Sequence, residues 1–499
     1  MEQKAYLGFD LGASSGRAML GYLEGEKLTI REIHRFPNDP VKLAGELVWD
    51  FPRLFHEMKQ ALLKISRGGI GLRSIGIDTW GCDFGLLDAS GHLISLPVHY
   101  RDARNNEDVM RRALSRLPEE EFYKLTGSAF RPFNTAMQLY SMRLRGDPRL
   151  DWAERLLFMP DLLAWCLTGA AGVEYTMATT SQLLDPGTGR WSREVFERLD
   201  LPEKLLPEPP ERTGSLRGTL LRDLAEECGV ERVSVYAVGS HDTASAVAAV
   251  PSEEDSFAFL SSGTVSLIGA VVPRPVFTRD AMLGDCTNEG CIDGSIRLLN
   301  NIVGLWVLQE CRREWERRGQ APDFAELVEL ARREPPYRSV IDIGDPRFYP
   351  PGDMPARIRQ YCRETGQAEP QTPGAVTRAV CESLALQYRI AMEALEERVL
   401  KRRFDVLHIV GGGSRNRMLD QFTANCLGRP VIAGPAEATV IGNLLTQALA
   451  AGELEDAAAI RRVVRASFGT ERYEPLPDPG QEEACALMRR LMDRRTSEA

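Results

Sequence analysis

The sequence predicts a mixed α/β protein built from two domains. Its 499 residues are too many for one hydrophobic core, which favours two domains of about 200–250 residues each. The first 110 residues read as hairpin strands, a helix and a further strand, the pattern of a mixed sheet covered by helices. A strand–turn–strand unit near Ser256 then repeats the opening unit. These three observations set the fold class.

The elements of the first part follow from short apolar or alternating runs. The predicted strands are residues 6–10, 17–23, 27–36 and 74–78. Asp50 is typical of a helix N-cap, with Pro52 in the first turn. Apolar residues follow from 54 to 62 at helical spacing, so one face of this helix is expected to pack inward.

The second half repeats the opening and then adds helices. The predicted elements are strands 256–260 and 265–272 around a turn at 261–264, a long helix from Thr372, a strand over 404–410 and a helix over 416–426. The apolar pattern is interrupted at residues 250–255, where we place the domain boundary. The predicted division is an N-terminal domain over 1–250, a C-terminal domain over 251–455 and peripheral helices over 456–499.

Composition and charge exclude several classes of function. The chain is 43% hydrophobic and 26% charged, as in ordinary globular proteins, and its net charge of −10 argues against a nucleic-acid partner. No stretch approaches the roughly 20 apolar residues that span a bilayer, and the N-terminus lacks a secretory pattern. We therefore expect a cytoplasmic protein with no membrane partner. The ten cysteines form no CxxC or Cys/His cluster, so we expect reduced thiols.

The segment over residues 10–17, Asp-Leu-Gly-Ala-Ser-Ser-Gly-Arg, has the composition of a phosphate-binding turn. Its small residues let backbone N–H groups approach an anion, and the serine hydroxyls add donors. Asp10, at the end of a predicted buried strand, is a candidate to hold hydrated Mg²⁺ beside the phosphates. An ordinary hairpin with a roomy turn explains the same residues, so both interpretations stay open.

Two later turns have related chemistry. Residues 261–264, Ser-Ser-Gly-Thr, repeat the small residues without the acid. Residues 410–414, Val-Gly-Gly-Gly-Ser, lie between a predicted strand and a predicted helix, where backbone amides and a helix N-terminus face a ligand. Each turn alone is weak evidence, and neither is a GxGxxG or Walker loop. Three such turns at strand ends favour a nucleotide.

Two acidic segments have the residue types needed to bind and activate a hydroxyl group that accepts a phosphoryl group. Asp242, within Gly-Ser-His-Asp-Thr-Ala, is a candidate general base, and it is equally a candidate helix N-cap. Residues 78–84, Asp-Thr-Trp-Gly-Cys-Asp-Phe, together with residues 100–102, Tyr-Arg-Asp, combine the aromatic and carboxylate groups that a sugar needs. A buried tryptophan with satisfied aspartates is the alternative.

These segments, in this order, resemble the FGGY family of carbohydrate kinases, within the actin/hexokinase superfamily. The similarity extends from about residue 5 to about residue 445 and is carried by residues 10–17, 33–36, 78–81, 100–102, 240–247, 301–306, 408–413 and 433–435. The glycine turns are shared across the superfamily, whereas Ser-His-Asp-Thr and Asp-Thr-Trp-Gly are more specific. The resemblance implies two ribonuclease-H-like domains with mixed sheets, flanked by helices, around a central cleft.

The resemblance also implies ATP-dependent phosphorylation of a sugar. The segments are most similar to those of family members that act on L-rhamnulose, which implies transfer of the γ-phosphoryl group to its C1 hydroxyl in L-rhamnose breakdown. Carried over by position, the ATP ligands are Ala13, Ser14, Ser15, Gly16, Arg17 and Thr264, with Gln309 and Gly412 nearer the adenosine. The sugar ligands are Gly81, His241, Asp242, Thr243 and Asn301, with Asp242 as the catalytic base.

One departure from the family pattern leaves the sugar open. Tryptophan commonly follows Ser-Ser-Gly-Thr in the family, whereas this chain has Val265, and a smaller side chain there would repack the wall of the site. The alternatives within the family are kinases for L-fuculose or L-xylulose. A monomer or a small homo-oligomer is expected.

Proteins of other classes share the phosphate turns. A chaperone ATPase needs a peptide-binding domain, and the charged remainder after Gly452 is too short for one. An actin-like filament former has no need of Asp242 beside His241. A sugar-binding regulator on an inactive kinase scaffold would be expected to lack Asp10, Asp242 or Thr264, and all three are present.

Overall fold

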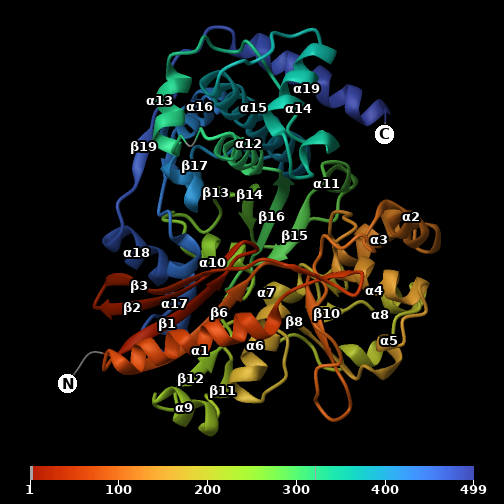
Figure 1. Cartoon of the computed structure of the whole chain (residues 1–499), viewed down its shortest axis with the longest axis vertical. Coiled ribbons are helices and arrows are strands. Elements are labelled where there is room, and N and C mark those ends of the chain that lie inside the picture. Colours follow the sequence, from red (N-terminus) through yellow and green to blue (C-terminus); the bar gives the residue numbers. More distant parts are fainter. Residues whose placement is uncertain (1–3, 321, 499) are drawn as a thin grey trace. The chain divides into compact units, whose positions relative to one another are not determined.

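The computed structural model describes residues 4–320 and 322–498, and its chain forms two compact units (Figure 1). Each unit is assembled from separate segments. The first contains Met1–Ser256, Val271–Leu298 and Glu437–Phe468, and the second contains Phe257–Ala270, Leu299–Ala436 and Gly469–Ala499. The division into family domains at residues 250 and 455 stays a prediction.

A six-stranded mixed sheet lies at the centre of the first unit, in the order β11-β12-β6-β1-β2-β3. Its strands are β1 (Ala5–Leu11), β2 (Ser15–Glu24), β3 (Lys27–Pro37), β6 (Leu72–Thr79), β11 (Leu216–Thr219) and β12 (Ser234–Tyr236). β1 pairs antiparallel with β2 and parallel with β6, and β6 pairs parallel with β12, which is antiparallel to β11. The register places Asp10 opposite both Arg17 and Asp78.

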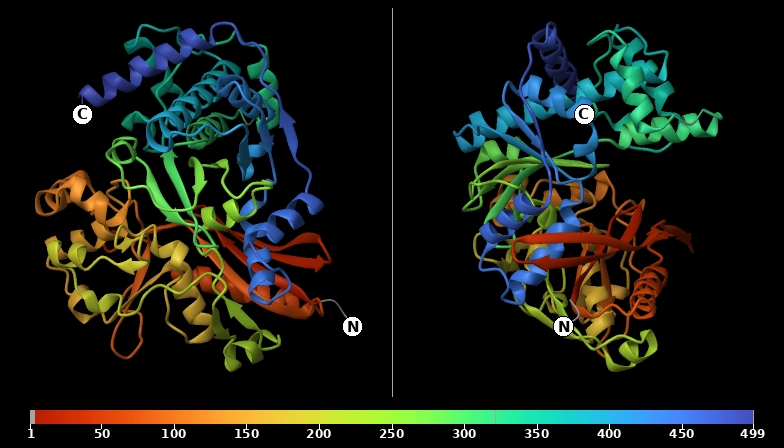
Figure 2. Two further views of the ribbon diagram at one scale, coloured as in Figure 1. Left: turned by 180° about the vertical axis from the view of Figure 1, so that it is seen from behind. Right: turned by 90° about the vertical axis from the view of Figure 1, so that its left-hand side faces the viewer.

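Helices cover both faces of this sheet. α1 (Phe51–Arg67) lies in front of it in Figure 1, and the view from behind in Figure 2 brings α17 (Ala438–Ala450) and α18 (Ala457–Ser467) forward. Small residues on the sheet admit α17. A Cβ added to Gly76 would lie 2.5 Å from Asn443 Oδ1, and one added to Gly21 would lie 2.8 Å from a methyl carbon of Leu444. Glycine there lets the helix approach the strands closely.

The remaining elements of the first unit surround this core. The helices are α2 (Glu107–Arg116), α3 (Glu119–Thr126), α4 (Thr135–Leu144), α5 (Arg149–Trp152), α6 (Met159–Thr168), α7 (Tyr175–Ala178), α8 (Arg193–Arg198), α9 (Arg222–Cys228), α10 (Asp242–Ala248) and α11 (Arg279–Leu283). The strands are β4 (Val41–Leu43), β5 (Glu46–Val48), β7 (Phe84–Leu87), β8 (Arg155–Phe158), β9 (Leu184–Asp185), β10 (Arg190–Trp191) and β15 (Thr287–Gly290).

A second mixed sheet repeats the topology of the first. Its order is β15-β16-β14-β13-β17-β18-β19, with β13 (Ala258–Ser262), β14 (Ser266–Val272), β16 (Ile296–Ile302), β17 (Leu407–Val410), β18 (Val431–Ala433) and β19 (Glu471–Tyr473). From β14 to β19 the successive pairings are antiparallel, parallel, parallel and antiparallel, as they are from β2 to β11. The predicted duplication of a mixed α/β unit is therefore confirmed.

The second unit also holds the long helix predicted from Thr372. Its helices are α12 (Trp306–Arg317), α13 (Phe324–Arg332), α14 (Met354–Glu364), α15 (Pro373–Glu393), α16 (Arg417–Leu427) and α19 (Gln481–Glu498). Thr372 caps α15 through its hydroxyl, as Asp50 caps α1 through its carboxylate. The strand predicted from residue 404 begins at Leu407, and the sequence did not predict β19. Among the described residues, no helix combines the length and apolar character needed to cross a membrane.

Candidate active site

The turn between β1 and β2 is held in shape by a residue outside it. The Gly12 N–H donates to the Ser15 carbonyl oxygen at 2.9 Å, which closes the turn. Asn38 donates from its backbone to the Ser14 carbonyl at 3.1 Å and from Nδ2 to the Gly12 carbonyl at 2.8 Å. Because Asn38 is buried, these bonds fix the turn from below. A brace of this kind suits a turn that must present its backbone to a ligand.

The glycine at the end of this turn makes a close contact that allows a prediction. A Cβ on Gly16 would lie 2.3 Å from Phe36 Cζ and 2.8 Å from Leu11 Cδ2. We expect Gly16→Ala to lower the free energy of unfolding by about 1–3 kcal/mol and to raise KM for ATP, since the ring must move. Urea unfolding and initial rates measure both effects. Gly469→Ala, whose Cβ meets nothing within 4 Å, is the control, and an unchanged unfolding midpoint for Gly16→Ala would contradict the prediction.

Arg17 is held between two carboxylates of the first unit. Its guanidinium pairs with Asp10 at the end of β1 and with Glu437 just before α17. Burial raises the pKa of Asp10, Arg17 opposes that rise, and the charges of Asp242 and Glu437 add to it. The sequence placed Asp10 and Arg17 at the two ends of one candidate phosphate turn but gave no signal for Glu437, which lies 420 residues from Arg17.

Three buried or half-buried aspartates act on one another beside this turn. Asp78 on β6 is fully buried; its Oδ2 accepts a hydrogen bond from Asn443 Nδ2 at 2.6 Å, and its Oδ1 has no partner within the described chain. Burial, reinforced by the charges of Asp10 and Asp242, raises the pKa of Asp78 well above its usual value. Mutual repulsion of this kind favours a bound cation.

The donor set fits Mg²⁺ held together with a nucleotide. No group of three or more His, Cys, Asp or Glu side chains in the described residues forms a metal-binding cluster. Mg²⁺ usually keeps several waters and is bound by one or two carboxylates plus substrate phosphates, so it does not need such a cluster. Asp10, at the base of the glycine turn, supplies a carboxylate of the required kind.

Asp242 occupies the first position of α10, and the N-cap is His241. The alternative that Asp242 is itself the N-cap is therefore wrong. Its side chain is 34% exposed, and its Oδ1 accepts a hydrogen bond from the Thr243 hydroxyl at 3.0 Å. His241 Nε2 lies 3.4 Å from the same oxygen. The structure thus brings a half-exposed carboxylate and an imidazole together at the edge of the first sheet, where the Thr79 N–H donates to the Ser240 carbonyl.

Gly81 lies directly against this group. A Cβ added to it would be 3.3 Å from Thr180 Oγ1 and 3.4 Å from His241 Nε2. The adjacent Cys82 has a positive φ of 73° and is buried, so its side chain is directed into the core. The backbone at Gly81 is therefore the part of this segment that reaches the candidate site.

Other groups in residues 78–102 are structural. Asp83 is fully buried and accepts hydrogen bonds from Trp49 Nε1 at 2.6 Å, Trp80 Nε1 at 3.0 Å, Gln138 Nε2 at 2.9 Å and the Tyr100 N–H at 3.2 Å. Burial raises the pKa of Asp83 to about 6, although these bonds oppose the rise. A buried tryptophan with a satisfied aspartate is thus the better interpretation of Trp80 and Asp83.

The Tyr-Arg-Asp segment, residues 100–102, is also partly structural. The carboxylate of Asp102 accepts from the Leu47 N–H at 2.7 Å and the Arg104 N–H at 2.9 Å, so it fixes two loops. Arg101 is exposed, with its guanidinium carbon 5.4 Å from the centre of the Tyr100 ring. The sequence alone could not separate these roles from sugar binding.

The second unit holds the other predicted ligands. The Thr264 hydroxyl donates to Gln309 Oε1 on α12 at 3.2 Å, which joins two residues predicted to bind ATP. Gly411 and Gly413 pack against Ser262, at 2.9 Å and 2.0 Å for an added Cβ, whereas a Cβ on Gly412 would meet nothing within 4 Å. Gly412 is thus the member of the triple glycine with open space beside it.

Two further residues of the second unit, which the sequence analysis also named, lie in or beside its strands. Asn301 lies on β16 and is half-buried. Val265, the departure from the family pattern, is 46% exposed at the turn between β13 and β14. Their roles stay predictions.

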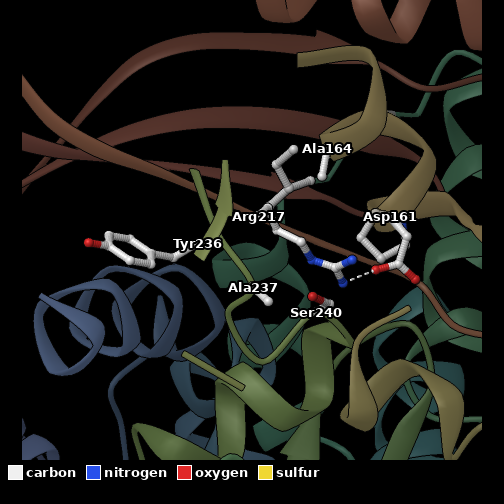
Figure 3. A pocket seen from close by; sticks show the side chains of 8 residues that line it. Asp161, Ala164, Arg217, Tyr236, Ala237 and Ser240 are labelled. Atoms are coloured by element: carbon white, nitrogen blue, oxygen red, sulfur yellow. Dashed lines mark hydrogen bonds and ion pairs between the residues drawn. The ribbon is translucent and has the colours of Figure 1, made fainter. Parts of the chain in front are cut away.

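A small cavity lies behind Ser240, the residue before His241 (Figure 3). Its volume is about 10 Å³, which is the size of one water molecule and far too small for a sugar or a nucleotide. The Asp161–Arg217 ion pair lines it, with Arg217 Nη2 2.5 Å from Asp161 Oδ1. This cavity lies among residues that support the candidate site, and it is not a substrate pocket.

Comparisons with known proteins decide what this arrangement serves. The FGGY family of carbohydrate kinases, N-terminal domain, matches residues 5–249, and its C-terminal domain matches residues 258–451. The chain belongs to the FGGY family of carbohydrate kinases. It is a phosphotransferase with an alcohol acceptor, and kinases of this family use ATP.

Curated relatives of this FGGY kinase are similar over nearly the whole chain. The rhamnulokinase of Bacteroides thetaiotaomicron is 41% identical over 474 residues, which cover 94% of this chain and 96% of that protein. The rhamnulokinase of Enterococcus faecalis is 40% identical over 479 residues, covering 96% and 95%.

Solved structures confirm the predicted fold class. A ligand-bound xylulose kinase from Lactobacillus acidophilus gives a TM-score of 0.78 at 15% identity, covering 99% of this chain and 97% of that one. Plasmodium falciparum glycerol kinase with ADP gives 0.76 at 14% identity, covering 99% and 98%. At these identities the likeness concerns the fold alone.

Proposed function

We propose that this kinase transfers the γ-phosphoryl group of ATP to the C1 hydroxyl of L-rhamnulose, giving L-rhamnulose 1-phosphate in L-rhamnose breakdown. The observation that carries the chemistry is the half-exposed Asp242 carboxylate at the start of α10, beside His241 and Gly81. The choice of sugar rests on the two rhamnulokinases that are about 40% identical over nearly their whole length.

In the proposed reaction Asp242 acts as the general base. Thr243 and His241 both contact Oδ1, so we assign the proton transfer to Oδ2. The C1 hydroxyl gives its proton to that oxygen as its own oxygen bonds to the γ-phosphorus. The bond from the γ-phosphorus to the bridging oxygen breaks, and ADP leaves with the electron pair.

The nucleotide is assigned to the glycine turns of both units. We propose that the turn over residues 13–17 and Thr264 bind the phosphates, and that Gln309 and Gly412 lie nearer the adenosine. Asp10 would hold Mg²⁺, which neutralises phosphate charge when it is bound. Its position near the end of β1, beside the glycine turn, supports that role.

The sugar is assigned to Gly81, His241, Thr243 and Asn301 together with the base. L-Rhamnulose has a primary hydroxyl at C1 and a methyl group at its 6-deoxy end. A site with an apolar corner for that methyl orients the sugar so that only C1 meets Asp242. We also propose that the kinase works in the cytoplasm, where ATP is supplied.

A coupled ADP-release assay over ketoses and deoxy-ketoses tests the substrate. We expect kcat/KM to be highest for L-rhamnulose, ahead of L-fuculose and L-xylulose, because the site must place both the methyl end and C1. The Asp242→Asn protein, prepared in the same way, controls for contaminating kinases. A higher kcat/KM for another ketose would overturn the named substrate and leave the sugar kinase intact.

A further inference from the structure

A buried ion pair lies against His241 on the side away from Asp242. It joins Glu289 on β15 to Arg297 on β16, and their side chains are 8% and 0% exposed. We propose that these two residues are positioning residues for sugar phosphorylation, which fix the ring of His241 so that its Nε2–H points at Asp242. This inference rests on the proposed function, in which Asp242 is the base.

The pair is anchored independently of His241. Arg297 donates from Nε and Nη2 to Glu289 Oε2 at 3.1 Å and 2.8 Å, and from Nη1 to the Gly290 carbonyl oxygen. Burial alone would raise the pKa of Glu289, but the adjacent positive charge of Arg297 lowers it to about 2. Glu289 therefore faces the Arg297 guanidinium as a carboxylate.

The contact with His241 decides the position of the ring proton. Arg297 Nη2 lies 2.7 Å from His241 Nδ1, and Glu289 Oε2 lies 3.1 Å from the same nitrogen. A guanidinium only donates hydrogen bonds, so the closer contact makes Nδ1 an acceptor. The neutral ring then carries its proton on Nε2, 3.4 Å from Asp242 Oδ1. The opposite tautomer would set the lone pair of Nε2 against the Asp242 carboxylate and an N–H against the guanidinium. The 3.1 Å contact of the Nδ1 lone pair with Glu289 Oε2 is offset by Arg297 Nη2, which donates to both atoms.

Fold stability alone does not explain why the Glu289–Arg297 pair is buried. Taking two charges out of water is expensive, and replacing a buried pair by apolar residues is often neutral or stabilising. In this protein the ion pair sets the orientation of one imidazole ring, that of His241. With Nε2–H on the side of Oδ1, that oxygen accepts a hydrogen bond from Thr243 and lies 3.4 Å from the His241 ring nitrogen, while the other oxygen faces the sugar hydroxyl.

The test uses Glu289→Gln and Arg297→Lys in the full-length protein. We expect kcat with L-rhamnulose to fall about 10-fold or more while KM for ATP stays close to wild type, because the ring of His241 loses its fixed orientation. Long-range ¹⁵N–¹H spectra of histidine-labelled protein report the tautomer, with His241→Gln identifying the signals. Wild type should show the Nε2–H pattern, and Arg297→Lys should lose it.

A second buried pair gives matched controls. Arg429 and Glu396 in the second unit are 7% and 6% exposed, with Arg429 Nη2 2.7 Å from Glu396 Oε2. Glu396→Gln and Arg429→Lys should lower the melting temperature by a similar amount but leave the His241 signals unchanged. A loss of kcat that tracks melting temperature in both pairs would overturn a positioning role.

Two further outcomes separate this inference from the proposed function. An Nδ1–H pattern for His241 in the wild-type protein would overturn the inference whether or not any variant folds. An unchanged tautomer and kcat in Glu289→Gln, beside an inactive Asp242→Asn, would overturn it and leave the proposed base in place. If Asp242→Asn stays active while Arg297→Lys alters the tautomer, the base assignment fails and the control of His241 by Arg297 stands.

Discussion

Asp242→Asn is expected to lower kcat by about 10²-fold or more while ATP and the sugar still bind. The amide has nearly the size of the carboxylate, and its oxygen still accepts the hydrogen bond that the Thr243 hydroxyl donates to Asp242. It cannot take a proton from the C1 hydroxyl. The helix also keeps its start, because His241 and not Asp242 is the N-cap of α10.

Steady-state rates together with calorimetric titration of ATP and L-rhamnulose separate the effect on turnover from that on binding. Asp323→Asn is a matched control, because Asp323 caps α13 through the Glu326 N–H at 2.8 Å, and asparagine is an equally good cap. We expect it to change neither rate nor affinity. Wild-type turnover by Asp242→Asn would remove Asp242 from the role of base.

The parts of the fold that the sequence predicted are those set by local pattern. The strands over residues 6–10, 17–23 and 27–36 lie within β1, β2 and β3, and the N-caps Asp50 and Thr372 bind the backbone of α1 and α15 as expected. Alternation of apolar residues and the spacing of capping side chains are determined by neighbours in the chain, so they can be read before any tertiary contact is known.

The parts that it missed depend on contacts between distant segments. Asn443 binds Asp78 across 365 residues, and Glu437 reaches Arg17 across 420. Both residues belong to the segment that packs α17 on the first sheet. This segment follows most of the second unit in the sequence. No periodicity links such positions. The sequence also gave no signal for Asn38, which braces the first turn, because an asparagine after a strand is typical of any loop.

One ion pair that the sequence analysis missed, Arg297 with Glu289, did leave a signal in the sequence. Arg297 interrupts the apolar run Ile-Arg-Leu-Leu within β16, and Glu289 lies eight residues earlier on the neighbouring strand. A charged residue in such a run indicates either an exposed strand or a buried ion pair, and a nearby residue of opposite charge favours the pair. What the pair contacts could not be predicted, since His241 comes from another sheet edge.

The largest expected effect on stability comes from Arg217→Met, which leaves Asp161 buried without its partner. The two side chains are 2% and 1% exposed, and Figure 3 shows the guanidinium directed at the carboxylate beside the small cavity. We expect the variant to lose about 3–5 kcal/mol of unfolding free energy at pH 8. Glu211, whose buried Oε2 lies 3.2 Å from Arg217 Nε, also loses a contact, although its side chain is 38% exposed overall.

The dependence on pH distinguishes a stranded charge from lost packing. Burial raises the pKa of Asp161 to about 7 even against the opposing charge of Arg217, so removing the arginine must raise it further. A carboxyl group that keeps its proton in the folded state contributes stability at low pH, and that stability is lost as the pH rises through the folded pKa. The penalty in Arg217→Met should therefore be larger at pH 8 than at pH 5 in urea unfolding. Asp161→Asn/Arg217→Met removes both charges of the buried pair and should recover most of the loss at pH 8. A penalty that is equal at both pH values and persists in the double variant would mean that Arg217 contributes packing and not charge.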